Sequence, residues 1–223
     1  MNYPRNSRNT IKRVPKRGHY DQETIFAILD AGFLAHVGIE VDGQPFVIPT
    51  AYGRDGDTIY LHGATTSRLI QQGQSGMRMC ITVTHLDGVV LARSAFHHSM
   101  NYRSTVLFGT ASLVPDEQKE AALLIISEQI LQGRWQESRL PNAKELKATS
   151  VLAFQIEDAS AKIRTGGPGD EPEDYALPVW AGVLPLQYVY GEPVPDDVLT
   201  AGIPVPESVK RVTGKGRRVK GIG

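Results

Sequence analysis

Residues 33–61 read FLAHVGIEVDGQPFVIPTAYGRDGDTIYL and contain two Asp-Gly pairs, Asp42-Gly43 and Asp55-Gly56, between apolar runs. Asp-Gly pairs supply the positive backbone φ that tight hairpin turns require. Three consecutive strands are therefore predicted, at residues 33–41, 45–52 and 58–61. This antiparallel meander is the centre from which the rest of the fold is predicted.

Helical patterns lie on both sides of the meander. Asp21 is a candidate N-cap for a short helix that ends at Gly32, and residues 65–72 form another short helix. Asp116 opens the longest helical segment, which Gly133 closes, and residues 143–148 form a small one.

Further strands are predicted on the C-terminal side of the meander. Asp87-Gly88 is expected to turn a hairpin of residues 77–84 and 89–92, and the other strands are expected at 106–114, 151–156 and 161–164. No GxGxxG motif follows a strand, so a dinucleotide-binding Rossmann fold has no support. The pattern predicts a mainly β (α+β) protein, an antiparallel barrel with peripheral helices.

The 223 residues have a formal net charge of zero, but lysine and arginine gather at the two ends. We expect a basic N-terminal tail at 1–18, one main domain at 19–190 and a Pro/Gly-rich basic tail at 191–223. Such tails are more often solvated, or docked on an acidic body, than bound to nucleic acid, so no nucleic-acid partner is expected.

No uninterrupted apolar run reaches about 20 residues, so no membrane span is expected. The segment that begins at Met1 does not resemble a secretory signal, which makes a cytoplasmic location the expectation. The one cysteine, Cys80, lies between Met79 and Ile81 in a predicted strand and is interpreted as a buried, inert thiol.

The segment 97–104, HHSMNYRS, places two imidazoles, an amide, a phenol, a guanidinium and hydroxyls beside an apolar strand. These groups suit a partly aromatic, anionic ligand. A metal site at His97-His98, with His62 and His85, is an alternative, but paired cysteines and HxxxH spacing are missing. Adjacent residues of a regular strand face opposite sides of the sheet, so His97 and His98 could not easily ligate one metal ion. We therefore expect no metal, and without a GxSxG elbow no serine hydrolase.

The segment 61–68, LHGATTSR, lies where a strand gives way to a helix. Gly63 allows close approach to the backbone, and Ser67 and Arg68 add a hydroxyl and a positive charge, so a phosphate site is one interpretation and a simple helix cap the other. Pro49 leaves neighbouring backbone groups open to a flat ring, or merely begins a strand. Trp180 is either a core side chain, which sequence alone favours, or a ring that stacks on a ligand.

Taken in order, seven segments resemble one known family: Ile48-Pro49-x-x-Tyr52, Tyr60-x-His62-Gly63-Ala64-x-x-Ser67-Arg68, Ser99-x-Asn101-Tyr102-Arg103-Ser104, Phe108-Gly109, Gly133-Arg134-Trp135, Ser160-Ala161-Lys162 and Val179-Trp180-Ala181-Gly182-Val183. They look like the motifs of the pyridoxamine 5'-phosphate oxidase-like flavin-binding proteins, and within them of the 5-nitroimidazole resistance reductases. The resemblance spans about residues 18–186 and leaves the flanking tails outside it.

The resemblance implies a split β-barrel that forms a homodimer with FMN in clefts at the subunit interface. It implies that Ser67 and Arg68 bind the phosphate, that His62 lies beside the ring, and that Trp180 approaches the cofactor of the partner subunit. The remaining implied cofactor contacts are Ile48, Pro49, Thr50, Tyr52, Gly63, Thr82, Asn101, Tyr102, Arg103 and Ser104.

An FMN-dependent oxidoreductase that reduces a small planar acceptor, such as a nitroimidazole, with NAD(P)H or another reductant is therefore the first hypothesis, with His62 as proton donor or substrate contact. Leu184-Pro185-Leu186 follows where the true pyridoxamine 5'-phosphate oxidases carry their arginine-rich substrate motif, so vitamin B6 oxidation is not expected. Two alternatives stay open: a non-catalytic module that carries flavin or haem, and a reductase that uses the deazaflavin F420.

Overall fold

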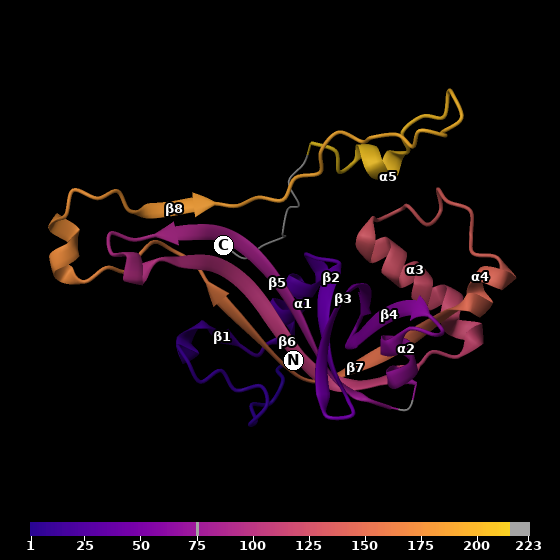
Figure 1. The fold of residues 1–223 in the computed structure, drawn as a ribbon, viewed down its shortest axis with the longest axis horizontal. Helices are drawn as coiled ribbons and strands as arrows, with labels where there is room; N and C mark the ends of the chain where they lie inside the picture. Colours follow the sequence, from indigo (N-terminus) through magenta and orange to yellow (C-terminus); the bar gives the residue numbers. More distant parts are fainter. Residues whose placement is uncertain (75, 215–223) are drawn as a thin grey trace.

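The computed structural model describes residues 1–74 and 76–214, and its strands form one antiparallel sheet that closes into a barrel (Figure 1). The strands are β1 (Gly18–His19), β2 (Leu34–Val41), β3 (Gln44–Asp55), β4 (Thr58–Ala64), β5 (Arg78–Leu91), β6 (Ser99–Leu113), β7 (Thr149–Arg164) and β8 (Gly182–Pro185). The α-helices are α1 (Gln22–Asp30), α2 (Arg68–Gly73), α3 (Lys119–Ile130), α4 (Ala143–Ala148) and α5 (Glu207–Lys210). Short 3-10 helices are η1 (Pro15–Arg17), η2 (Ala95–His97), η3 (Asp116–Gln118) and η4 (Pro172–Ala176).

The barrel wall follows the order β7-β4-β3-β2-β5-β6, and β6 pairs with β7 to close it. Each of these pairings is antiparallel. The prediction of a mainly β, antiparallel split barrel with peripheral helices is confirmed.

The two turns of the meander form as the Asp-Gly pairs predict. Asp42 and Gly43 have φ of 52° and 77°, and they join Val41 of β2 to Gln44 of β3. In the second turn Gly56 has φ of 55° and the loop residues are Gly56 and Asp57, because Asp55 still pairs with Thr58.

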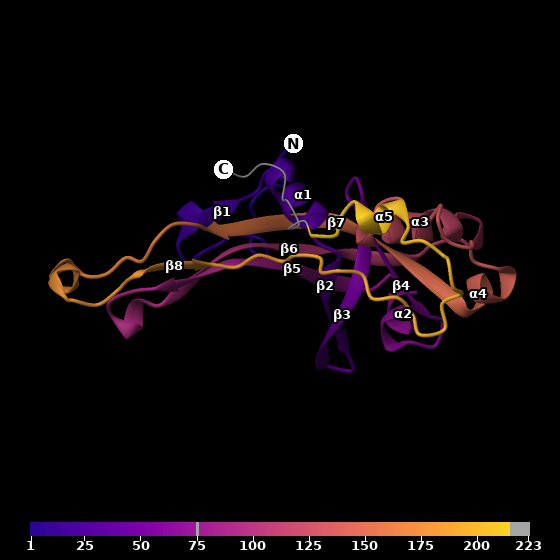
Figure 2. The same ribbon diagram turned by 90° about the horizontal axis from the view of Figure 1, so that it is seen from above.

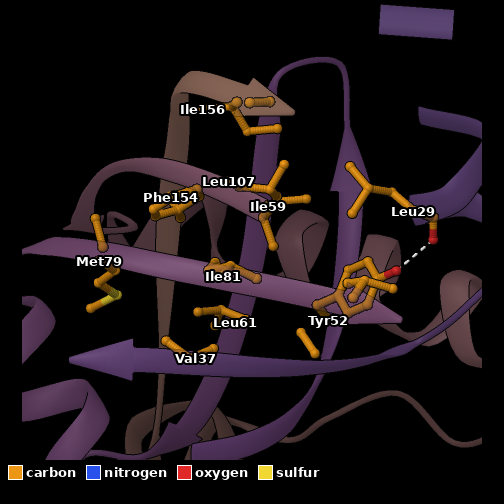
Figure 3. Packing of buried hydrophobic residues seen from close by; sticks show 14 of the residues in the cluster. Leu29, Val37, Tyr52, Ile59, Leu61, Met79, Ile81, Leu107, Phe154 and Ile156 are labelled. Carbon is orange, nitrogen blue, oxygen red and sulfur yellow. Dashed lines mark hydrogen bonds between the residues drawn. The ribbon is translucent and has the colours of Figure 1, made fainter. Parts of the chain in front are cut away.

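The core lies inside the barrel, where strands β2 to β7 contribute side chains (Figure 3). Val37 of β2, Ile81 of β5 and Leu107 of β6 are completely buried there. Helix α1 covers one end, and the hydroxyl of buried Tyr52 donates a 2.5 Å hydrogen bond to the carbonyl of Leu29 at the end of that helix. Asp21 caps α1 as predicted, accepting from the amide of Thr24.

The predicted hairpin at Asp87-Gly88 and the predicted break between residues 156 and 161 are both wrong, because β5 and β7 are continuous strands. The pair Asp87-Gly88 does not turn the chain: β5 runs through it to Leu91, with an irregularity in its pairing to β6 between Leu86 and Gly88. From Gly88 to Val90, β6 pairs with one edge of β5 and β8 pairs with the other. Hydrogen bonds on both sides therefore keep the β5 backbone extended. Likewise β7 is one strand from Thr149 to Arg164 rather than two.

The long strands leave the barrel as an arm (Figure 1). Strand β8 lies along the outer edge of β5, and η2 and η4 lie near the tip. From β8 the chain runs back across the molecule to α5, which lies beside α3 (Figure 2).

The N-terminal segment lies against the barrel. Tyr3 is buried and its hydroxyl donates to Asp57, while Arg8 forms an ion pair with buried Asp158 on β7. Asn9, also buried, donates to the carbonyl of Ala159. The basic residues Lys215, Arg217, Arg218 and Lys220 of the expected C-terminal tail lie outside the described residues. Among the described residues no helix has the length and apolar character needed to cross a membrane.

Candidate functional site

The outside of the barrel wall presents a face that this chain leaves largely uncovered over β2, β3 and β5. Ala35, Val37 and Ile39 point into the core, so alternation along β2 turns the intervening side chains outward. Strand register aligns them with partners on both sides, and we call the following set the outer face: Leu34, His36, Gly38, Val47, Pro49, Ala51, Cys80, Thr82 and Thr84. Apart from His36, it consists of apolar and small polar side chains, which can lie against a planar ring.

The sequence-predicted ring contacts divide between the outer face and the core. Pro49 and Thr82 lie in one row of the outer face, because both pair with His36. By contrast, Ile48 packs against the core and Tyr52 is completely buried in it. These two residues can contact a ligand on the outer face only through their main chain. Thr50 is half-buried, and its hydroxyl donates to the carbonyl of Ala51 at 3.3 Å.

The predicted phosphate residues lie at the junction of β4 and α2. Ser67 is the N-cap residue of α2, but its hydroxyl makes no capping bond. A Cβ at Gly63 would lie only 3.0 Å from that hydroxyl, so glycine lets the serine lie against the strand. The Arg68 side chain is exposed, its guanidinium stacks on the Phe46 ring at 4.1 Å, and in the described part of the chain it has no ion-pair partner. A free guanidinium beside a free hydroxyl can bind a phosphate.

His62 lies in a cavity of about 330 Å³ between the barrel wall and the helices α3 and α4. Its neighbour Leu61 points into the core, so the imidazole faces outward, on the same side of the wall as Pro49 and Ala51. The cavity walls are mainly apolar: Leu123, Ile126, Ser127, Ile130, Trp135, Pro141, Glu145, Leu146 and Thr149. The helices thus place mainly apolar side chains around one partly buried imidazole.

The Nδ1 atom of His62 is buried and has no hydrogen-bond partner among the described residues. Burial also lowers the pKa of this imidazole below its ordinary value. The neutral ring that results at pH 7 is suited to ligate a metal-containing cofactor and is a poor proton donor. The mainly apolar walls and the unpaired nitrogen suit a ligand with apolar surface that can accept a neutral imidazole.

The quartet of residues 101–104 holds β6 to its neighbours. Buried Asn101 donates to the carbonyl of Gly166 at 3.1 Å and accepts from Arg164, so its amide is already paired on both sides. Arg103 makes a two-pronged ion pair with Asp87 at 2.7 and 2.8 Å. These contacts fix the base of the arm.

The two other members of the quartet are less constrained. Ser104 donates to the carbonyl of Lys162 at 3.4 Å, and the Tyr102 ring is half-buried. Strand pairing aligns Ser104 with Thr84, so the serine continues the outer face onto β6. Arg103 and Thr84 also line a broad groove of about 2060 Å³ between the barrel, α3 and the returning C-terminal chain.

Trp180 and the histidine pair lie on the arm, away from His62. The Trp180 residue is 68% exposed, so its interpretation as a core side chain is wrong. Nε2 of His97 lies 3.6 Å from Glu171, and Nδ1 of His98 accepts a hydrogen bond from the Ala92 amide. Within residues 1–74 and 76–214 no three His, Cys, Asp or Glu side chains come together in a way that could hold a metal ion.

Cys80 is free and only half-buried, on the outer face rather than in the core. Burial nevertheless raises the pKa of its thiol, which keeps it in the less reactive protonated form.

Sequence reasoning missed several site residues. His36 and Leu34 face outward because side chains alternate along β2, and Leu34 is 52% exposed. The period-2 pattern of residues 33–41 in the sequence could have identified both residues. Leu123, Ile126 and Trp135 of the His62 cavity had no comparable signal, because their approach to β4 depends on how α3 packs on the barrel.

The closed antiparallel wall, the peripheral helices and the junction of β4 and α2 define the class of split β-barrel proteins. The model of the pyridoxamine 5'-phosphate oxidase family matches residues 21–163, and the chain belongs to this family. It therefore has the family's flavin-binding split-barrel fold. No curated protein matches the chain at a significant level.

Three solved structures are similar to the chain. The flavocytochrome Anf3 from Azotobacter vinelandii is 42% identical, with a TM-score of 0.86, over 93% of this chain and 97% of that one. The FAD and haem binding protein from Mycobacterium smegmatis is 38% identical, with a TM-score of 0.86, over 91% and 99%. A structure described as a putative 5-nitroimidazole antibiotic resistance protein from Bacteroides thetaiotaomicron is 23% identical, with a TM-score of 0.54, over 66% and 86%, and shows a shared fold.

Proposed function

We propose that this protein is a two-cofactor redox protein that binds a flavin against the outer face and a haem at His62. The observation that carries the proposal is the buried, unpartnered Nδ1 of a neutral imidazole in an apolar cavity. Support comes from the two relatives at 42% and 38% identity, one described as a flavocytochrome and the other as binding FAD and haem.

The chain's own residues divide the work between the two cofactors. His62 would hold the haem through an imidazole nitrogen, while Leu123 and Ile126 would keep water from that imidazole. Ser67 and Arg68 would hold the flavin phosphate. When bound, the flavin supplies one- or two-electron chemistry and the haem one-electron chemistry.

The two sites are neighbours on one surface. Alternation along β3 and β4 directs Pro49, Ala51 and His62 to the same side of the barrel wall, and β3 pairs directly with β4. A flavin against β3 and a haem at β4 would therefore lie close together, an arrangement suited to electron transfer between them. The first hypothesis of an FMN-dependent reductase is thereby extended to a flavin that exchanges electrons with a haem.

The flavin itself is proposed as FMN on the family resemblance, and the description of the Mycobacterium smegmatis relative favours FAD. Both carry the phosphate that Ser67 and Arg68 suit. Chromatography of the flavin released from purified protein separates FMN, FAD and F420.

Visible spectra of protein produced with a haem precursor test the proposal. We expect a haem band together with flavin absorbance, and we expect His62→Ala to lose the haem band and keep the flavin. The matched control is His98→Ala, at the tip of the arm, which should keep both. Protein that takes up neither added haem nor flavin would overturn the proposal.

Turnover separates an enzyme from a passive carrier. Reduction of the bound flavin by NADPH or NADH, followed by reoxidation with a nitroimidazole, is the outcome expected for a reductase. Flavin that remains oxidised with both reductants would restrict the protein to electron exchange with another donor.

A further inference from the structure

The loop between α3 and α4 forms one wall of the His62 cavity, and the Glu128 carboxylate holds its first turn. Glu128 of α3 accepts hydrogen bonds from the backbone amides of Gly133, at 2.7 Å, and Trp135, at 3.4 Å. Gly133 adopts φ of 86°, which reverses the chain at this point. The half-buried Trp135 ring is thereby placed in the cavity that His62 lines.

The same loop is held from outside by the C-terminal helix α5. Glu137 accepts from both the amide and the hydroxyl of Ser208, and Ser208 is 1% exposed. Arg211 donates to the carbonyl of Gln132 at 2.7 Å. These bonds lower the pKa of the Glu137 carboxyl, so it stays ionised and keeps accepting at neutral pH.

The contact between α5 and the loop is close as well as polar. A Cβ at Gly133 would lie 2.5 Å from the Arg211 guanidinium, so glycine allows the helix to lie directly on the turn. Segments separated by more than 70 residues therefore meet at the loop that carries Trp135.

We propose that Trp135 is the aromatic wall that lies against a flat macrocycle bound at His62, and that α5 holds this wall in place through the Glu137–Ser208 contact. The inference rests on the proposed haem site for its ligand, but the coupling between α5 and Trp135 does not. A tryptophan face contributes dispersion and offset stacking to a planar ring, which a smaller side chain cannot replace.

Fluorescence tests the coupling without any cofactor. The chain has two tryptophans, so Trp180→Phe leaves Trp135 as the only tryptophan, excited selectively at long wavelength, and serves as the common parent. In this background we expect Glu137→Ala to shift the emission to longer wavelength and to increase quenching by acrylamide. The matched control is Glu207→Ala, on the same α5, whose carboxylate pairs with exposed Lys210. Emission and quenching in Glu137→Ala that equal those of the parent would overturn the coupling.

Titration with hemin tests the wall. We expect Trp135→Ala, and Glu137→Ala through its displaced loop, to weaken hemin binding about tenfold, and we expect Trp135→Phe to keep most of the affinity. Circular dichroism confirms that each variant is folded. If Trp135→Ala binds hemin as tightly as the parent does, the proposed contact between Trp135 and the macrocycle is overturned. If the parent binds no hemin, the proposed haem site and the ligand role of Trp135 fall together, whereas the emission comparison still decides the coupling to α5.

Discussion

At the scale of single residues, Arg68 is the strongest candidate for the flavin phosphate. Its guanidinium is exposed and stacked on Phe46, and its charge has no carboxylate partner among the described residues. Arg68→Ala removes charge-assisted hydrogen bonds to a dianion, which costs about 2 kcal/mol of binding free energy. We expect flavin affinity, measured by fluorescence titration, to fall by more than tenfold.

A matched control for Arg68 lies in the N-terminal segment. Arg5 is likewise an exposed arginine whose guanidinium stacks on an aromatic ring, that of Tyr20 at 4.4 Å, and it belongs to neither proposed cofactor site. We expect Arg5→Ala to bind flavin as the native chain does. Equal affinities in the two variants would place the phosphate elsewhere.

His62 should make stability depend on pH in a definite direction. Burial lowers its pKa below the ordinary value of 6.5, so as pH falls through 6.5 the unfolded chain takes up a proton that the folded chain does not. The free energy of unfolding therefore decreases as pH falls from 7.5 to 5. Denaturant unfolding of native protein and of His62→Gln should show that the free energy of unfolding of the native protein, relative to the variant, decreases as pH falls over this range. A difference that stays constant with pH would contradict the lowered pKa.

At the scale of elements, the irregularity between Phe108 and Gly109 lets β6 stay paired with β7 from Tyr102 to Leu113. A Cβ at position 109 would lie 1.9 Å from the carbonyl oxygen of Gln155, so the two strands would have to separate. We expect Gly109→Ala to lower the free energy of unfolding by about 3 kcal/mol, measured in urea. The control Gly167→Ala, where a Cβ meets nothing within 4 Å, should change it by less than about 0.5 kcal/mol.

Local signals predicted the elements whose turns are local. Asp42-Gly43 adopts the positive φ that its residues favour, and Asp21 caps α1. Asp87-Gly88 carries the same dipeptide but lies within β5, because β6 and β8 hold the backbone extended. That outcome depends on pairing partners far along the chain, which a local pattern does not contain.

The candidate site was likewise predictable only where its signals are local in the sequence. Ser67 and Arg68 follow a strand-to-helix junction that is visible in the sequence, and in the structure they are the N-cap and the first residue of α2. Asn101, by contrast, has its amide paired with Gly166 and Arg164, so it supports the base of the arm. The cavity at His62 arises from the packing of α3 on β4, and only the assembled fold reveals it.

At the scale of the whole molecule, the outer face predicts a second copy of the chain. Leu34 and Val47 are 52% and 68% exposed on this face, which also carries Pro49 and Ala51, and large contiguous apolar patches are typical of interaction surfaces. A symmetric partner laid over it would close a dry crevice around a ring held by Ser67 and Arg68. We therefore expect sedimentation to show a dimer, consistent with the family resemblance.

The variants Leu34→Lys and Val47→Lys place charge in the centre of that expected interface, and we expect dimerisation to weaken about tenfold or more. Leu113→Lys, at the C-terminal end of β6 and 44% exposed, is the matched control and should remain dimeric. If the partner completes the flavin site, dilution of either outer-face variant should release flavin, seen as a rise in flavin fluorescence, in parallel with the loss of dimer. Native protein that sediments as a monomer with flavin still bound would show instead that one chain suffices for the site.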